Sequence, residues 1–206
     1  LLKFSLTINK KIGIVFQNED DRKQLIQLGI INKASRTFVV NGSGVDLLYY
    51  EFTEPDTTSI SFLMTARLIN AKGIQEFYQA AALINQKYPA IKFKLIGEYE
   101  KTNIDGISED LFNKIKSNKI LEYYGQVEDV RPFIKESSVV VLPSYGEGLP
   151  RSILEALAMG RAIITTNAAG CKETVNPSSL CTNGFLVPVK DVPALVSIME
   201  HYINNP

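Results

Sequence analysis

Two glutamates flank a turn that is rich in glycine and proline. Glu147 and Glu155 occur in the sequence SYGEGLPRSILEA, with seven residues between them. Pro150 is expected at the first position of a helix, where its fixed φ angle and missing N–H group are tolerated. The free amides of residues 151–153 would then point back into the turn with the positive end of the helix dipole, which favours an anion such as phosphate.

The two carboxylates would lie on either side of this anion. With a rise of about 1.5 Å per residue, Glu155 would lie roughly 7 Å beyond the helix start, within reach of a sugar next to the phosphate. Glu147 lies in the turn itself, where Gly148 lets a ligand approach the backbone. Carboxylates accept hydrogen bonds from hydroxyl groups. Alternatively, Glu155 pairs with Arg151 one helical turn away and Glu147 is a solvated loop residue.

Cations occupy a second turn. Arg67 follows the buried run SISFLMTA, and Lys72 precedes a glycine that leads into an amphipathic helical pattern. Ligands bind beyond the carboxyl ends of parallel strands, where two cations and a helix start could clamp a diphosphate. Alternatively, both are surface charges on a solvated loop. Gly97 ends another strand, and backbone groups around Val127 could meet a flat base without a charged partner.

These turns need a sheet that brings them to one edge. Strands are predicted at 11–16, 37–40, 59–66, 91–97, 120–125, 139–143, 162–166 and 184–189, and helical segments at 20–29, 74–89, 108–117, 130–137, 150–159, 168–175 and 191–203. This alternation predicts an α/β fold with a Rossmann-like, doubly wound parallel sheet. In the first helix, Leu25, Ile26 and Leu28 are expected to form the buried side.

Composition narrows the possible partners. Lys and Arg number 22 and Asp and Glu number 22, so no global field favours nucleic acid or an anionic membrane. Cys171 and Cys181 lack the spacing of a metal site and are expected to be unreactive thiols in a reducing compartment, with a disulfide as the alternative. The single histidine, His201, removes most His-based metal sites and catalytic triads.

A dinucleotide site is not favoured. Gly42 and Gly44 begin a G-x-G pattern after a strand, but Leu47 stands where the fingerprint requires Gly or Ala, and no helix follows. We expect a glycine turn at the rim of the sheet.

The sequence also lacks a membrane-spanning run and a signal peptide, which predicts a soluble chain. Its start without Met suggests a piece of a longer protein.

Taken together, the three turns suit a nucleotide diphosphate that carries a sugar. The segments NGSGVD, RLINAKG, LIGE, YGQV, PSYGEGLPRSILEALAMGRAIITT and NGFLVPV occur in this order. Over residues 18–203 the chain resembles the C-terminal, donor-binding half of the retaining glycosyltransferases of family four, the group 1 type with a GT-B fold. Residues 1–36 would then be the end of the N-terminal domain or the interdomain connection, and 37–206 the single donor-binding domain.

The resemblance implies roles for these residues. Arg67 and Lys72 would bind the donor diphosphate and stabilise the negative charge of the departing nucleotide, as catalytic groups. Glu147, the third catalytic residue, would contact the donor sugar, and Glu155 would accept hydrogen bonds from the ribose. The other implied donor-binding residues are Gly97, Val127, Gly148 and Leu149.

The same resemblance implies partners. The donor would be a UDP-sugar or GDP-sugar, with no metal and no cofactor, since Asp-x-Asp is absent and cations neutralise the charge. A glycan or lipid-linked sugar would bind to the missing N-terminal domain, without which the chain would bind donor but be inactive. The full enzyme would act with retention in cell-surface polysaccharide synthesis, in the cytoplasm or with peripheral association at the inner face of a membrane.

Other functions stay open. A non-catalytic nucleotide-sugar-binding module, a nucleotide-sugar epimerase of related fold and a glycosidase with two catalytic glutamates are the alternatives. The intact set of Arg67, Lys72, Glu147 and Glu155 favours a transferase over a degenerate module. No acid and base pair for epimerisation is evident, and phosphate-binding surroundings argue against a glycosidase. NGSGVD has two residues more than the usual turn of the family, so the exact geometry of the rim does not follow from the resemblance.

Overall fold

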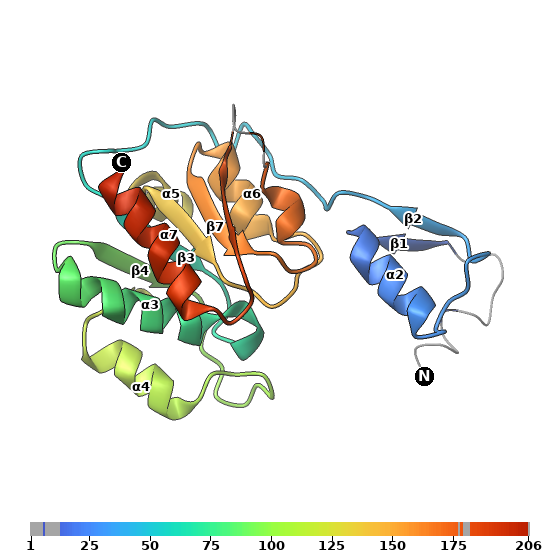
Figure 1. The fold of residues 1–206 in the computed structure, drawn as a ribbon, viewed down its shortest axis with the longest axis horizontal. Coiled ribbons are helices and arrows are strands. Elements are labelled where there is room, and N and C mark those ends of the chain that lie inside the picture. The colour runs from blue at the N-terminus through green and yellow to red at the C-terminus, as the bar shows by residue number, and fades with distance from the viewer. Residues whose placement is uncertain (1–5, 7–12, 177, 179–181, 206) are drawn as a thin grey trace.

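A six-stranded parallel sheet forms the centre of the molecule (Figure 1). The structure, a computed structural model, describes residue 6 and residues 13–176, 178 and 182–205. Strands follow the order β5-β4-β3-β6-β7-β8, and every neighbouring pair is parallel. Their bounds are β3 Ser61–Thr65, β4 Lys92–Ile96, β5 Glu122–Tyr123, β6 Val139–Leu142, β7 Ala162–Thr166 and β8 Gly184–Val187. The predicted doubly wound sheet is therefore confirmed.

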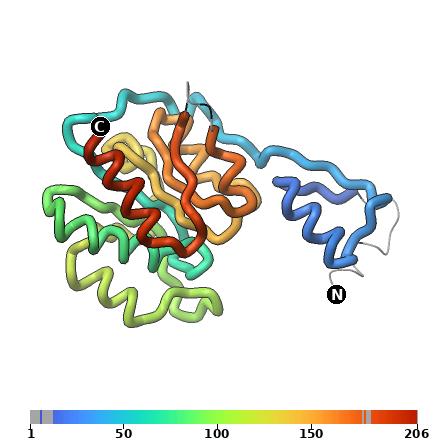
Figure 2. Tube along the Cα trace, in the orientation of Figure 1, coloured from blue at the N-terminus to red at the C-terminus, as the bar shows by residue number. Residues whose placement is uncertain are grey.

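Helices cover both faces of this sheet. α3 and α7 lie side by side on one face, with α4 next to α3, and α5 and α6 lie on the other (Figures 1 and 2). The chain runs outward from the centre in opposite directions, from β3 to β4 and from β6 to β7, so right-handed connections place their helices on opposite faces. The helices are α3 Ile74–Lys87, α4 Glu109–Ser117, α5 Arg131–Lys135, α6 Arg151–Ala158 and α7 Val192–Asn204, with 3₁₀ turns η1 Asn70–Lys72 and η2 Lys172–Thr174.

The central strands are short apolar runs that are buried on both faces, as parallel strands between helices must be. All four residues of β6 are buried. Phe62 of β3 stacks on Phe93 of β4 with ring centroids 5.3 Å apart, and Phe77 of α3 meets Phe93 edge-on. This packed core fixes the carboxyl ends of β3, β4 and β6, where the predicted site residues lie.

Residues 13–40 form a separate N-terminal unit, seen at the right of Figure 1. β1 (Ile14–Phe16) pairs in parallel with β2 (Thr37–Val39), and α2 (Glu19–Gln27) connects them. Residues 41–60, the connecting segment, join this unit to the main sheet (Figure 2). The domain boundary drawn at residue 36 runs through the unit, and the division into domains stays a prediction.

The buried side predicted for α2 is wrong. Leu28 is 64% exposed, and no residue within α2 is buried. The apolar stripe is present in the sequence and α2 contacts β1 and β2, but this two-stranded layer leaves every residue of the helix at least partly exposed. Farther along, Gly42 and Gly44 have φ angles of +67° and +69° in the irregular stretch of residues 40–46 that follows β2, and no helix follows them, as expected. The glycine turn at the rim of the sheet stays a prediction.

Several predicted elements are shorter in the structure, two of them by more than half. The predicted strand at 120–125 is reduced to Glu122–Tyr123, and the predicted helix at 168–175 is the single 3₁₀ turn Lys172–Thr174. The described part of the chain contains no helix that is both long enough and apolar enough to cross a membrane.

Arg161 anchors the connecting segment to the main domain. Its side chain is buried, and burial lowers its pKa from the ordinary arginine value. The guanidinium donates to the backbone oxygens of Thr53 (2.7 Å), Ile134 (3.0 Å) and Lys135 (3.2 Å) and to the Thr53 hydroxyl. One buried cation thus joins the connecting segment to α5 through carbonyl groups.

Arg161→Met is expected to lower the free energy of unfolding by about 3 kcal/mol, because buried carbonyls lose their donors. For a chain of this size, the melting temperature should fall by about 6–12 °C, measured by differential scanning calorimetry. Lys87→Met is the matched control: it breaks the exposed Lys87–Glu200 pair and should cost less than about 1 kcal/mol. Equal losses in both variants would contradict the anchoring role.

Candidate functional site

The predicted site residues meet at the switch point of the sheet. β3 and β6 are neighbours, yet the chain leaves them in opposite directions, toward β4 and toward β7. In such sheets a crevice opens beyond the carboxyl ends of the two central strands. Arg67 and Lys72 follow β3, and Glu147 follows β6 within residues 144–150, which we call the site loop. The topology therefore brings the two predicted turns together.

Lys72 and Glu147 form a direct ion pair. The Lys72 Nζ atom lies 2.6 Å and 2.7 Å from the two carboxylate oxygens of Glu147. The side chains are 21% and 11% exposed, so both are partly withdrawn from water. Lys72, which was predicted to bind the diphosphate, and Glu147, which was predicted to bind the sugar, thus bind each other in the free site.

Backbone contacts between η1 and the site loop hold this pair in place. The Tyr145 amide and the Ser144 hydroxyl both donate to the carbonyl of Ala71, at 2.8 Å and 3.0 Å. Gly73 follows with a φ of +76°, and a Cβ atom there would lie 2.2 Å from the Pro143 oxygen. Only glycine permits this approach, which sets the height of Lys72 above the sheet.

Arg67 presents an available positive charge at the same edge. Its side chain is exposed, and it forms no hydrogen bond or ion pair with any residue that the structure describes. The prediction of two cations that follow β3 is therefore refined: Lys72 is neutralised by Glu147, whereas Arg67 offers its full charge to an incoming anion.

Glu155 lies one turn into α6 with a side chain that is only 13% exposed. Burial raises its pKa, and interactions with the Tyr50 hydroxyl and with Arg151 oppose that increase. The anticipated pairing with Arg151 exists, but at 3.8 Å it is longer than a hydrogen bond. For Tyr50 in turn, burial and then Glu155 raise the pKa to about 12. Sequence spacing gave no signal for Tyr50, because it comes from the connecting segment.

The start of α6 differs by one residue from the prediction. Pro150 occupies the N-cap position, and the helix begins at Arg151. The amide of Ile153 donates to the Pro150 oxygen at 3.2 Å. Of the three amides expected to face the turn, those of Arg151 and Ser152 are left without partners among the described residues.

Gly148 and Leu149 contact segments from outside the main domain. A Cβ atom at position 148 would lie 1.8 Å from the Gln17 Oε1 atom, so a side chain of the N-terminal unit fills the space beside this glycine. A Cβ atom at position 42 would lie 2.6 Å from a methyl carbon of Leu149. The close approach that we expected for a ligand at Gly148 is thus made, on one side, by Gln17.

Gly97 lies at the carboxyl end of β4. Its φ is 153°, and a Cβ atom would lie 1.7 Å from the Ala66 oxygen. Its amide donates to the Gly125 oxygen at 2.8 Å, and its carbonyl accepts from the Tyr123 hydroxyl at 2.9 Å. Val127 is half-buried against the core shortly after this contact. The ends of β4 and β5 are therefore joined where a base was predicted to lie.

Three further residues near the site, Tyr145, Glu76 and Lys190, come from separate elements, and no sequence pattern indicated them. The Tyr145 hydroxyl donates to Glu76 Oε1 at 2.7 Å, and burial raises the pKa of Tyr145 above its ordinary value. Lys190 Nζ lies 4.7 Å from the centre of the Tyr145 ring. Through Tyr145, the site loop therefore contacts Glu76 of α3 and Lys190 of the β8–α7 connection.

Cys171 lies near the ion pair, close enough to be affected by the charges of Glu147 and Lys72. It is fully buried, and burial raises its pKa, with a smaller contribution from the Glu147 charge. The expectation of an unreactive thiol fits this environment, whereas Cys181 falls outside the described residues. His201 of α7 packs edge-on against Phe185 of β8, with ring centroids 5.2 Å apart. No cluster of three His, Cys, Asp or Glu side chains suited to a metal occurs within the described residues.

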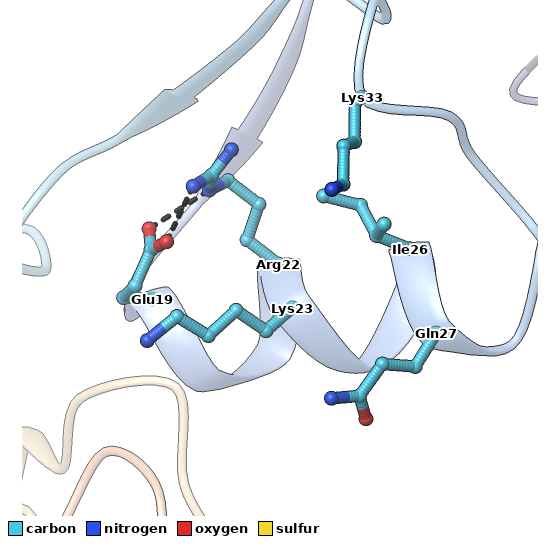
Figure 3. Close-up of a pocket in the computed structure, with 6 residues that line it drawn as sticks. All are labelled: Glu19, Arg22, Lys23, Ile26, Gln27 and Lys33. Atoms are coloured by element: carbon cyan, nitrogen blue, oxygen red, sulfur yellow. Dashed lines mark hydrogen bonds and ion pairs between the residues drawn. The ribbon is translucent and has the colours of Figure 1, made fainter.

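A hollow of about 410 Å³ lies elsewhere, on α2 of the N-terminal unit (Figure 3). Its labelled side chains do not converge on one point, and the guanidinium of Arg22 is already occupied by Glu19. The hollow is lined by Glu19, Arg22, Lys23, Ile26, Gln27 and Lys33. We therefore place the functional site at the switch point and not in this hollow.

Comparison with known proteins agrees with this placement. A family model described as "Glycosyl transferases group 1" matches residues 59–205, which contain the whole sheet. The chain belongs to the group 1 glycosyltransferases. The matched range includes Arg67, Lys72, Glu147 and Glu155, whereas the N-terminal unit and most of the connecting segment precede it.

Curated relatives of this group 1 glycosyltransferase include two bacterial enzymes. The chain is 29% identical over 176 residues to the N,N'-diacetylbacillosaminyl-diphospho-undecaprenol alpha-1,3-N-acetylgalactosaminyltransferase of Campylobacter jejuni, covering 79% of this chain and 44% of the relative. It is 30% identical over 143 residues to the UDP-Gal:alpha-D-GlcNAc-diphosphoundecaprenol alpha-1,3-galactosyltransferase of Escherichia coli, covering 68% and 36%. The chain therefore spans less than half the length of these relatives.

Solved structures show the same architecture. Anabaena HepE in complex with UDP and glucose superposes with a TM-score of 0.80 at 21% identity, over 99% of this chain and 57% of HepE. At this identity the likeness establishes the fold alone. The Rossmann-like sheet of a GT-B glycosyltransferase, expected from the sequence, is thereby confirmed.

Proposed function

We propose that this chain is the donor-binding half of a glycosyltransferase that moves a sugar from a nucleotide diphosphate to a glycan or lipid-linked acceptor. The observation that carries this proposal is the partly buried Lys72–Glu147 pair at the switch point, with the exposed Arg67 on the same edge. The pair combines a cation for a diphosphate with a carboxylate for sugar hydroxyls within one contact. A site for a lone phosphate would have no use for the carboxylate.

Charge neutralisation explains how the site promotes departure of the nucleotide. When the bond between the sugar and the β-phosphate breaks, negative charge grows on the phosphate oxygens. Arg67 and Lys72 face that charge, and preorganised cations stabilise such a transition state more than the ground state. Because two side chains supply this charge, the proposed reaction needs no metal ion and no cofactor.

The two glutamates bind the hydroxyl groups of the donor sugar and of the ribose. As Lys72 turns toward the diphosphate, Glu147 accepts hydrogen bonds from the sugar hydroxyls, and the amides of Gly148 and Leu149 face the donor. Glu155 exchanges the Tyr50 hydroxyl for those of the ribose. The base lies beside Val127 and the Gly97–Gly125 contact, where backbone groups read it.

Transfer proceeds with retention in this proposal. The acceptor hydroxyl attacks from the face on which the nucleotide leaves, the bond to the new sugar forms as the old one breaks, and a departing phosphate oxygen takes the hydroxyl proton. The acceptor binds to the rest of the full-length protein. Both named relatives act on diphospho-undecaprenol-linked sugars. This agrees with a lipid-linked acceptor in polysaccharide synthesis, reached from the cytoplasmic face of a membrane by peripheral association.

A transfer assay tests the proposal. The full-length protein is incubated with UDP-galactose or GDP-mannose and an undecaprenyl-diphosphate-linked sugar, with and without EDTA. The product is examined by NMR. We expect a new glycosidic linkage with the anomeric configuration of the donor, formed equally well in EDTA. Binding of donor without any product would support a non-catalytic module, and an inverted linkage or a strict need for metal would contradict the mechanism.

Glu155→Ala is expected to weaken UDP or GDP binding about ten- to hundredfold, because a charged acceptor for the ribose hydroxyls is lost. Inorganic pyrophosphate, which has no ribose, is the matched ligand control and should bind unchanged in calorimetry. Burial raises the pKa of Glu155, so nucleotide affinity should decline as the pH falls through that raised value. Glu155→Gln should remove this decline. Equal weakening of pyrophosphate would show that Glu155 does not read ribose.

A further inference from the structure

The side chain of Asn18 joins the N-terminal unit to the site loop. Asn18 is only 2% exposed, and its Oδ1 atom accepts from the Asp21 amide at 2.8 Å, which caps α2. Its Nδ2 group donates to the backbone oxygens of Glu147 and Gly148, at 3.1 Å and 2.9 Å, and to Asp21 Oδ2 at 3.0 Å. One buried amide therefore serves a helix cap and two consecutive carbonyls, 129 and 130 residues away.

Neighbouring contacts support the same junction. Gln17 fills the space beside Gly148, as described above. Lys172, which follows β7, forms an ion pair with Asp20 in the first turn of α2. The junction thus involves three residues of the N-terminal unit, Gln17, Asn18 and Asp20, which makes it a defined contact and not an isolated hydrogen bond.

Peptide geometry gives the Asn18 contact a consequence for the donor. In a trans peptide the C=O and N–H groups point in opposite directions, and the chain has no cis peptide bond. The carbonyls of Glu147 and Gly148 point toward Asn18, so the amides of Gly148 and Leu149 point away from the N-terminal unit. Neither amide has a hydrogen-bond partner among the residues described.

We propose that Asn18 is a positioning residue that holds the amides of Gly148 and Leu149 toward the donor sugar. This inference rests on the proposed function and adds a specificity device to it. A helix cap alone requires only an acceptor, which Ser or Asp supplies as well as Asn does. The two carbonyls require a donor with two N–H groups. Among the capping side chains, only Asn provides these two N–H groups together with the acceptor oxygen for the cap.

This requirement allows the cap and the positioning role to be separated. Asn18→Ser and Asn18→Asp keep an acceptor for α2 but lose the amide that donates to the site loop, whereas Asn18→Ala loses both. Ser108→Ala is the matched control, because it removes the cap of α4, where the Ser108 hydroxyl accepts from the Leu111 amide at 3.2 Å.

The experiment measures affinities of the full-length protein by calorimetry for UDP and UDP-galactose, and for GDP and GDP-mannose. In the pair that binds, Asn18→Ser and Asn18→Asp should weaken the sugar nucleotide about tenfold while the free nucleotide changes less than about twofold. Ser108→Ala should lower the melting temperature and leave the ratio of the two affinities unchanged. A wild-type ratio in Asn18→Ser would overturn the proposal.

Hydrogen exchange provides a readout that does not depend on a ligand. In the free protein, Asn18→Ser should accelerate exchange at the Tyr145 and Glu147 amides, which donate to the Ala71 and Ala169 oxygens at 2.8 Å and 2.9 Å, because the site loop is no longer held. Unchanged exchange would also overturn the proposal. If wild-type protein bound none of the four nucleotides, the proposed function would fail, and the exchange rates would still decide whether Asn18 orders the site loop.

Discussion

Lys72→Ala is expected to reduce the turnover of sugar transfer by about 100- to 1,000-fold in the full-length protein. Two effects act in the same direction. The variant removes a cation that stabilises the departing diphosphate, and it leaves the 11% exposed Glu147 carboxylate without a partner, next to an anionic ligand. The radiochemical transfer rate at saturating donor measures this loss directly.

A double variant separates the two effects. In Lys72→Ala combined with Glu147→Gln, the repulsive carboxylate is gone, so UDP or GDP affinity should recover in part while transfer stays low. Lys87→Ala is the surface control, because the Lys87–Glu200 pair lies on the exposed contact of α3 with α7, away from the site. A turnover of Lys72→Ala within about threefold of wild type would show that this cation does not serve the reaction.

Glu147→Gln should change binding and transfer in opposite directions. Without the carboxylate, Lys72 carries a full charge into the free site, so the affinity for UDP or GDP should rise by about two- to tenfold, a modest gain because the pair is partly solvated. The donor sugar loses a charged acceptor, so turnover should fall by about 100-fold or more.

This opposition distinguishes a functional carboxylate from a structural one. A merely structural ion pair would, when broken, lower the melting temperature and weaken the nucleotide and transfer alike. Calorimetric affinity for the free nucleotide and turnover with its sugar should therefore be measured on the same preparation. Weaker nucleotide binding in Glu147→Gln would contradict the arrangement in which Lys72 alternates between Glu147 and the diphosphate.

Local patterns sufficed for the main domain and for the placement of its turns. The β-branched run at 139–142 indicated a strand, and Gly73 and Gly97 marked the start of a helix and the end of a strand. Once β3 and β6 were recognised as parallel strands, their carboxyl ends had to share an edge. The positions of Arg67, Lys72 and Glu147 followed from that rule, and not from any direct signal of contact.

Contacts between distant segments could not be read from the sequence. The bidentate Lys72–Glu147 pair spans 75 residues, and the Asn18 contact with the site loop spans 130. The role of Asn18 at the site loop had no sequence pattern, because it depends on a carbonyl direction that only folding defines. Tyr50 gave no pattern because the connecting segment has no periodicity. The apolar stripe of α2 was visible, but whether another layer covers it was not.

Calorimetric titration of the full-length protein with UDP and with GDP, in wild type and in Lys72→Ala, tests the central claim most directly. That claim is that the switch point of the sheet binds the diphosphate of a sugar donor through Lys72. We expect wild type to bind at least one nucleotide with a Kd below about 1 mM, and Lys72→Ala to weaken it at least about tenfold. Absence of binding by wild type at millimolar nucleotide, or equal affinity in both proteins, would contradict the claim.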